Sequence, residues 1–377
     1  MPAKKRQHYV PRFLLGHFSL LKNEKQINLY NISKKAIIKS VSLKRQAAQD
    51  YFYGKDGAIE DILSTIETEG SRLLNSIKNA ESVPKLYSPE HKVLLYLVLS
   101  LNARTLYKAK EQNKLINKFI KTIASHDPLL RKDIKNVEFE WSDPALISLV
   151  MMSYTFPIAT DLNCKLIINR TDSPFILADN PVVFYNQFLE NRNKIGSNTG
   201  LAAKGLEIFL PINPKHMIVF YDHKVYKLGS ANKNSVEILN SEDIASLNGL
   251  QLINANENIY FNEYLNDKYI NDLAAKFGKY RNKKQANVDK YDDMFADGDT
   301  KDLLIFIHKE DIRCNLKLSV IKILKRAKKL ELSNNVFQLR NPNLMQIFGE
   351  FDKLVKNNYY KENEFKKFLY DKLTGKI

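Results

Sequence analysis

The residues best suited to chemistry lie within the first eighteen positions of the chain. The stretch QHYVPRFLLGHF, residues 7–18, follows a short basic leader and holds an amide, two histidines and an arginine. Histidine changes charge nearest neutral pH, so His8 is a candidate general acid or base, or a metal ligand. Gln7 can orient an imidazole nitrogen or hydrogen-bond a substrate. The alternative is that His8 is an ordinary hydrogen-bonded histidine, since the stretch lacks the HxxxH and CxxC spacings of metal sites.

The local sequence predicts how His8 is presented. Pro11 fixes its own φ and biases Val10 towards an extended conformation. A proline is also favourable at the first position of a helix, where its missing N–H would have no partner. We therefore expect His8 on extended chain, followed by a short helix that begins at Pro11 and buries Phe13 and Leu14.

Two acidic residues lie on the next predicted element. Residues 56–77 carry isoleucines and leucines at helical spacing, which predicts an amphipathic helix. Glu60 and Glu67 lie two turns apart along one edge of its apolar stripe. Such carboxylates are usually solvated or salt-bridged, but an edge that faces a cleft is also where a site carboxylate would lie.

An arginine on the following helix is the natural partner of these acids. A helix capped by Ser88 is predicted from Pro89 towards Ile123, with Arg104 at the edge of its apolar face. A guanidinium cannot lose its charge, so a buried one must meet a carboxylate, a phosphate or a carbonyl. Arg104 is either a structural salt-bridge partner of Glu60 or Glu67, or an anion clamp.

A second polar box lies between two apolar runs. Asp179 and Asn180 stand directly before a proline, which predicts a kinked turn at the rim of a sheet. Asp179 is either an acid, base or metal carboxylate, or it satisfies local backbone N–H groups in an Asx turn. A helix predicted over residues 241–255 places Asn248 on its polar side.

The remaining pattern indicates an α+β fold with a mixed or antiparallel sheet and several long helices. Residues 26–32 and 36–43 alternate apolar and polar side chains, which predicts a hairpin. We expect a main body over residues 1–280 that carries the site, and a linker of mixed charge over 281–300. A smaller C-terminal helical/β module over 301–377, which is basic, could contact nucleic acid, a partner protein or a second copy of the chain.

Composition bounds the class of protein. The chain has 377 residues, 44% of them hydrophobic, which is typical of a folded globular protein. Cys164 and Cys314 share no motif, and no secretory leader or membrane span is apparent, so we expect a cytoplasmic protein with reduced thiols. The net charge of +16 suits RNA or DNA as a partner. Abundant lysine, asparagine and isoleucine are also typical of AT-rich genomes, which is the competing explanation.

Several of these boxes together resemble one family. QHYVPRFLLGHF, IEDILSTIETEGSRLLNSI, Arg104-Thr105, and FILADNPVV followed by LPINP are similar to the uncharacterised bacterial family "domain of unknown function 4238". The resemblance covers roughly residues 5–270. Ala178 stands where the family usually has serine, so a role for that hydroxyl is not carried over. The resemblance singles out Gln7, His8, Pro11, Glu60, Glu67, Arg104, Asp179, Asn180, Pro181 and Asn248.

The family name implies no reaction, but the joint selection of distant polar residues fits one shared pocket. We expect a hydrolase acting on nucleic acid, nuclease-like, or on a nucleotide, with an effector role in anti-phage defence or as a toxin. His8 would be the acid/base, Asp179 would orient it or hold a divalent metal, and Glu67 would be a second carboxylate. Substrate binding would fall to five further residues: Gln7, Glu60, Arg104, Asn180 and Asn248. The alternative is a non-enzymatic module that binds nucleic acid, a small anion or a partner protein.

Overall fold

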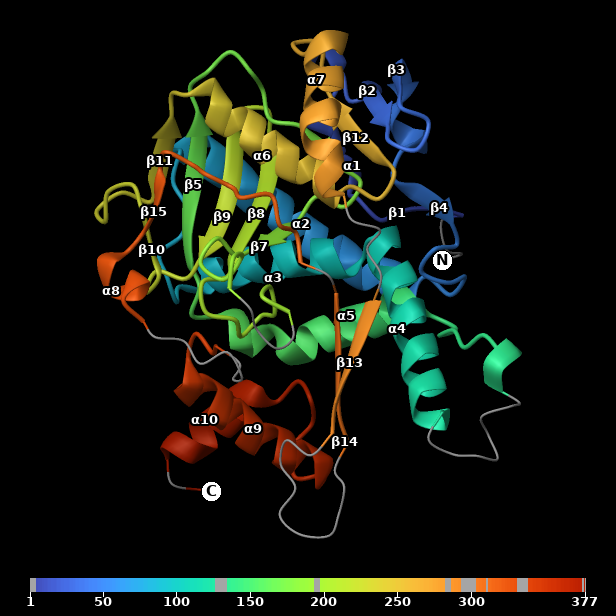
Figure 1. Cartoon of the computed structure of the whole chain (residues 1–377), viewed down its shortest axis with the longest axis vertical. Helices are drawn as coiled ribbons and strands as arrows, with labels where there is room; N and C mark the ends of the chain where they lie inside the picture. Colours follow the sequence, from blue (N-terminus) through green and yellow to red (C-terminus); the bar gives the residue numbers. More distant parts are fainter. Residues whose placement is uncertain are drawn as a thin grey trace.

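Two sheets organise the chain, as a computed structural model shows for residues 5–125, 134–192, 197–281, 286–292, 303–309, 311–330, 338–374 and 376 (Figure 1). The larger sheet has the strand order β11-β5-β9-β8-β7, and only the β11–β5 pair is parallel. The second sheet, β3-β2-β12-β6, is antiparallel. The fold is therefore α+β with mixed and antiparallel sheets, as the sequence predicts. The strands of these sheets are β2 (Gln26–Asn31), β3 (Ala36–Ser42), β5 (Asn163–Asn169), β6 (Leu177–Ala178), β7 (Val183–Tyr185), β8 (Glu207–Asn213), β9 (His216–Tyr221), β11 (Ser235–Ile238) and β12 (Asn258–Phe261).

Helices cover both faces of the larger sheet. On one side, α6 packs against β7 and β11, and α7 packs on α6. On the other side, the ring of His91 in α3 meets that of Phe220 in β9 at 5.5 Å. Because both faces are covered, β8 and nearly all of β5 are buried along their length. The helices of this body are α1 (Arg12–Gly16), α2 (Ala58–Ala80), α3 (Pro89–Ala103), α4 (Leu106–Ala124), α5 (Pro144–Thr155), α6 (Ser241–Asn254) and α7 (Asp267–Phe277).

The hairpin predicted at residues 26–43 is confirmed as β2 and β3, and the amphipathic helix after it as α2. The single long helix predicted from Pro89 to Ile123 is wrong. The chain breaks at Arg104, and Thr105 starts α4 by accepting a hydrogen bond from the backbone N–H of Lys108 at 3.2 Å. The break turns the Arg104 side chain into the interior, where it is 3% exposed. No helix among the described residues is long and apolar enough to span a bilayer.

The C-terminal third departs from the predicted division. Residues 286–292, expected within a linker, form β13 (Ala286–Asp292), because β14 (Leu303–Lys309) offers its backbone for antiparallel pairing. Residues 312–327, expected in a separate module, contribute five buried apolar side chains to the main core. Within them β15 (Ile321–Ile323) pairs with β10 (Tyr226–Leu228) and is followed by α8 (Lys325–Lys328).

The last two helices form a second apolar cluster together with Ile158 and Tyr154 of the main body. Phe348 and Phe351 of α9 (Pro342–Lys356) pack on Phe365 and Phe368 of α10 (Phe365–Leu373). A buried ion pair between Arg340 and Asp161, at 2.8 Å, attaches this cluster to the main body. α9 and α10 therefore lie beyond the end of the main core, below α5 in Figure 1.

Candidate functional site

His8 lies at the end of a short strand that the rest of the N-terminal region holds in place. β1 (Arg6–His8) pairs antiparallel with β4 (Ala48–Asp50), so His8 sits on extended chain as predicted (Figure 1). Pro11 precedes α1 at its N-cap, with φ −57°. Arg104 donates from Nη2 to the backbone carbonyl of His8 at 2.7 Å. The helix break between α3 and α4 therefore fixes the position of His8.

The guanidinium of Arg104 binds three groups of the protein. Its Nη1 donates to Oε1 of Glu67 at 2.6 Å and its Nε to the hydroxyl of Tyr53 at 3.0 Å, in addition to the bond to His8. Of the two readings of Arg104, the structure shows the salt bridge to Glu67. Arg104 acts on His8 as a positioning residue in this arrangement.

The side chain of Gln7 also binds the backbone around it. Its Oε1 accepts from the N–H of Tyr53 at 2.6 Å, and its Nε2 donates to the carbonyl of Gly54 at 3.1 Å and to Glu60 at 3.5 Å. Gln7 thus fixes Tyr53, which in turn accepts from Arg104. The sequence did not single out Tyr53, because a tyrosine in YFYG looks like any apolar strand residue.

Glu67 lies beside a hollow on the surface of the molecule. Its side chain is 28% exposed and lines a polar hollow of about 390 Å³ on the surface of α2. Phe13 of α1 forms one side of the hollow, and the rest is lined by Ser64, Thr68, Ser71, Arg72 and Asn75 of α2. The Glu67 carboxylate, held by the buried Arg104, therefore borders an open depression of the surface.

The imidazole of His8 is neutral at physiological pH. Burial lowers its pKa to about 4, and the charges of Arg12, Arg6 and Arg104 act in the same direction, while a hydrogen bond with the backbone of Lys44 opposes them. Nε2 of the ring is buried and has no hydrogen-bond partner among the described residues. A neutral imidazole with an unpaired nitrogen is the form that accepts a proton or a metal ion.

The surface around His8 is basic. Arg6, Arg12, Lys44 and Arg45 are exposed and come from β1, α1 and the turn before β4. Arg6 donates to Asp50 at 3.2 Å, which offsets one of these charges. Basic side chains grouped beside a neutral histidine favour an anionic ligand, such as a phosphate, because its charge is attracted by the group as a whole.

Asp179 lies in a second polar group, centred on α6 and the segment that leads into β12. Its Oδ1 accepts from the N–H of Asn256 at 2.6 Å, and its Oδ2 accepts from those of Glu257 and Asn258 at 2.9 and 3.0 Å. It is 2% exposed. Burial raises the pKa of Asp179 to about 6, although these three hydrogen bonds favour the charged form. Asp179 therefore binds backbone N–H groups, as the structural alternative expected, but these groups lie 77–79 residues away in the sequence and not in a local Asx turn.

A ladder of three amides on α6 binds the backbone of the segment that carries Asp179. Asn248 accepts from the N–H of Ile176 and donates to the carbonyl of Pro174, both within 3.0 Å. Gln251 does the same for Ala178 and Pro181, and Asn254 donates to the carbonyls of Asn180 and Val182. The prediction that Asn248 lies on a polar face of its helix is wrong, since it is fully buried. The facing segment forms only a two-residue strand, so the amides supply the partners that a sheet would otherwise provide.

Asn180 belongs to this second group as well. Its side-chain amide donates to the carbonyl of Asn254 at 3.2 Å, and it is buried. The sequence offered one signal for the ladder that was not used: the amides at 248, 251 and 254 recur every three residues on one helix face. Arg281, another unpredicted contributor, donates to the carbonyls of Leu252 and Ala255 at the C-terminal end of α6.

The predicted site residues therefore form two groups. Gln7, His8, Glu60, Glu67 and Arg104 meet around Tyr53, whereas Asp179, Asn180 and Asn248 meet at α6. Tyr9 lies between them: burial, followed by the nearby charges of Asp179 and Glu257, raises the pKa of its hydroxyl. Among the residues that the structure describes, no set of three or more histidine, cysteine or acidic side chains is grouped as metal ligands.

Comparisons with known proteins add a family but no activity. A family model described as "Protein of unknown function (DUF4238)" matches residues 6–264. No curated protein and no solved structure matches the chain. The matched region contains both polar groups and ends shortly after β12.

Proposed function

Because the chain belongs to this family of proteins of unknown function, its chemistry has to be inferred from the site, and we propose that it hydrolyses nucleic acid or a nucleotide at His8. The observation that supports the proposal is the His8 imidazole, which is neutral, has an unpaired buried nitrogen and lies among basic side chains. A phosphate-bearing substrate fits this environment by charge. The neutral ring fits the role of a base that removes a proton from the attacking water or hydroxyl.

Substrate binding and catalysis are linked in this proposal. An imidazole with a pKa of about 4 is a weak base, and the ideal value lies near the working pH. A phosphate bound by Arg6 and Arg12 would place negative charge beside His8 and raise its pKa towards neutrality. His8 would then be an effective base only when substrate is present. Glu67, at the polar hollow, is the second carboxylate available to orient substrate or water.

The other predicted residues support the site from a distance. Arg104 and Gln7 position β1, and the α6 amides hold the segment around Asp179, so these side chains need not touch substrate. The involvement of a divalent metal stays a prediction, which adding and chelating Mg²⁺ or Mn²⁺ in the same assay would test. A cytoplasmic location and an effector role in phage defence or toxicity also stay predictions.

The test is an activity assay on RNA, DNA and nucleotides, comparing the wild type with His8→Ala. Loss of a placed acid/base typically lowers the rate about 10²–10⁴-fold. We expect such a loss with an unchanged denaturation midpoint. His223→Ala, in the turn between β9 and β10, is the matched control and should keep full activity. A His8→Ala protein that hydrolyses substrate at the wild-type rate would refute the proposal.

The alternative is a module that binds polyanions without cleaving them. One observation favours it: the charged groups that shift the pKa of His8 are all basic, and Glu67 is engaged by Arg104. Phosphate-driven binding weakens steeply as salt rises. A wild-type protein that binds RNA or DNA in this salt-dependent way, and cleaves neither, would favour the binding module.

A further inference from the structure

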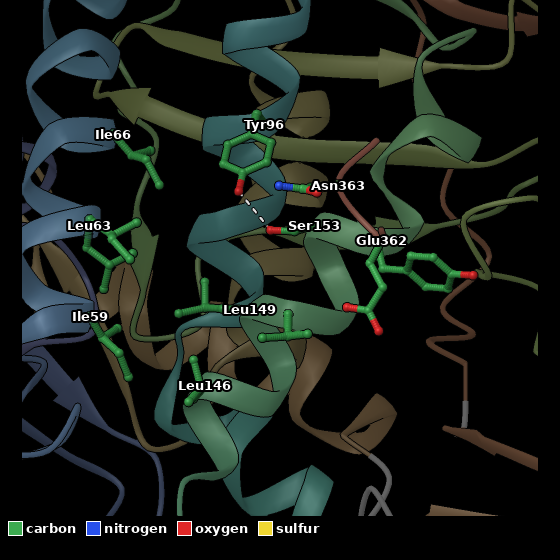
Figure 2. Close-up of a pocket in the computed structure, with 12 residues that line it drawn as sticks. Ile59, Leu63, Ile66, Tyr96, Leu146, Leu149, Ser153, Glu362 and Asn363 are labelled. Atoms are coloured by element: carbon green, nitrogen blue, oxygen red, sulfur yellow. Dashed lines mark hydrogen bonds between the residues drawn. The ribbon is translucent and has the colours of Figure 1, made fainter. Parts of the chain in front are cut away.

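An apolar groove runs between α2 and α5. Figure 2 shows Ile59, Leu63 and Ile66 of α2 facing Leu146 and Leu149 of α5 across it. Tyr96 of α3 lies at its floor, with its hydroxyl 2.8 Å from that of Ser153. The groove has a volume of about 230 Å³. The two helices therefore leave a space that their own side chains do not fill.

Large apolar side chains beside the groove are exposed to water. Ile62 of α2 is 63% exposed, Val150 of α5 is 44% exposed, and Met151 next to it is 53% exposed. Single exposed apolar residues are ordinary, but a group of them around a hollow marks an interaction surface. Methionine adds adaptability to such a surface because its side chain is unbranched and flexible.

The C-terminal helix carries a second exposed apolar feature close by. Leu373 of α10 is 86% exposed and Tyr370 is 60% exposed, and the two lie on one helix face because they are three residues apart. Glu362 and Asn363 line the groove, and α10 begins at Phe365. At 1.5 Å per residue, the nine residues of α10 span about 13 Å.

We propose that the α2–α5 groove binds the Tyr370–Leu373 face of α10 from a second copy of this chain. Because the groove and α10 adjoin in each copy, one two-fold axis can satisfy both contacts at once, which is the usual closed arrangement of a homodimer. Charge supports this occupant. Glu362 is the one charged residue among the described residues that line the groove, and α10 carries Lys366. Lys367 and Lys372 of α10 pair with Glu364 and Glu350 of their own chain.

Salt separates this contact from nucleic-acid binding. Two chains of net charge +16 repel each other, and salt screens that repulsion over a distance of about 8–10 Å. An apolar interface is not weakened by screening, so the dimer should become more stable as salt rises from 50 to about 300 mM. Binding of RNA or DNA should change in the opposite direction.

The test measures the mass of the full chain by sedimentation over a range of concentrations. The wild type should show a concentration-dependent dimer, and Val150→Glu and Leu373→Glu should each be monomeric at concentrations where the wild type dimerises. Leu239→Glu is the matched control, because Leu239 is 78% exposed but lies just before α6, and it should dimerise like the wild type. A monomeric wild type, or equal disruption by Leu239→Glu, would overturn the proposal.

Cross-linking gives a second readout that does not depend on affinity. A Val150→Cys protein mixed with a Leu373→Cys protein should form a disulfide-linked heterodimer under mild oxidation. A mixture of Leu239→Cys and Leu373→Cys should not. If the two mixtures cross-link equally, α10 does not occupy the groove. Neither experiment involves His8, so the hydrolase proposal stands or fails separately.

Discussion

Replacing Arg104 by methionine tests the geometry that positions His8. Arg104 is 3% exposed and binds Glu67, Tyr53 and the carbonyl of His8. Methionine keeps much of the side-chain volume but removes the Arg104 donor from all three acceptors, of which the His8 carbonyl keeps the Tyr53 hydroxyl as a second donor at 3.3 Å. Removing one partner of a buried ion pair typically costs about 3–5 kcal/mol of unfolding free energy. We expect Arg104→Met to lower the free energy of unfolding by an amount in this range. The loss is not larger, because the partly exposed Glu67 carboxylate can recover some hydration.

A double-mutant cycle isolates the Arg104–Glu67 bond from the other two. Urea denaturation of the wild type, Arg104→Met, Glu67→Gln and the double variant should give a coupling of about 1.5–3 kcal/mol, as for hydrogen bonds to charged groups. Arg72 and Glu69 on α2 form the matched exposed pair, at 2.9 Å. Their cycle should give about 0.2–1 kcal/mol. Equal coupling in the two cycles would refute the conclusion that Arg104 is a buried positioning residue.

Three further predictions concern titration and the buried polar groups. The pKa of His8 is about 4 in the folded protein and 6.5 in the unfolded chain, so the unfolded chain binds the proton first and the free energy of unfolding falls as pH drops from 6.5 to 4. NMR titration of the imidazole should show a midpoint near pH 4, and inorganic phosphate should raise that midpoint. Asp179 has the opposite effect on stability, because its pKa of about 6 in the folded protein exceeds the value of 3.8 in the unfolded chain. Its contribution to the free energy of unfolding therefore grows as pH falls from 6 to 4. Asp179→Asn should remove that trend from urea denaturation measured across this pH range. Asn248→Ala leaves the N–H of Ile176 and the carbonyl of Pro174 without their side-chain partner, which should lower the free energy of unfolding by about 1–3 kcal/mol per group in the same measurement. A total loss below about 1 kcal/mol would contradict the conclusion that the α6 amides stabilise this segment.

Local sequence signals predicted helices and strands, but they did not predict the break at Arg104 between α3 and α4, which matters most to the site. The apolar stripe of α2 arises from burial on one face, which the sequence shows directly. Residues 26–43 form the predicted hairpin, although β2 is buried at four consecutive positions and not on one face only. The break at Arg104 has no proline or glycine to announce it. It depends on Tyr53, Glu67 and the carbonyl of His8, three acceptors distant in sequence that together hold the guanidinium inside. Such a break comes from tertiary contacts and outweighs helix propensity.

The same reason explains why Asn248 was placed on a solvated face. An asparagine in a helix ordinarily faces water. It is buried only when the segment packed against the helix offers hydrogen-bond partners to its amide. Here that segment, residues 174–182, carries the backbone groups that need donors and acceptors. The three-residue spacing of amides on α6 is visible in the sequence. The role of this spacing becomes clear only once the backbone groups of residues 174–182, which face α6 and need partners, are known.

These contacts change the interpretation of the residues that the family resemblance singles out. Gln7, Arg104, Asp179 and Asn248 are all buried, and each binds backbone groups that the fold leaves without partners. A structural need is therefore sufficient to explain why each has its side-chain type. His8 differs, because its Nε2 has no such partner among the described residues and the charges around it are basic. Substitutions of Asp179 and Asn248 should lower activity only in proportion to the folded fraction, whereas those of Gln7 and Arg104, which position β1, should also lower the activity of the folded protein. His8→Ala should lower activity most while the protein remains folded, because Nε2 of His8 has no hydrogen-bond partner among the described residues.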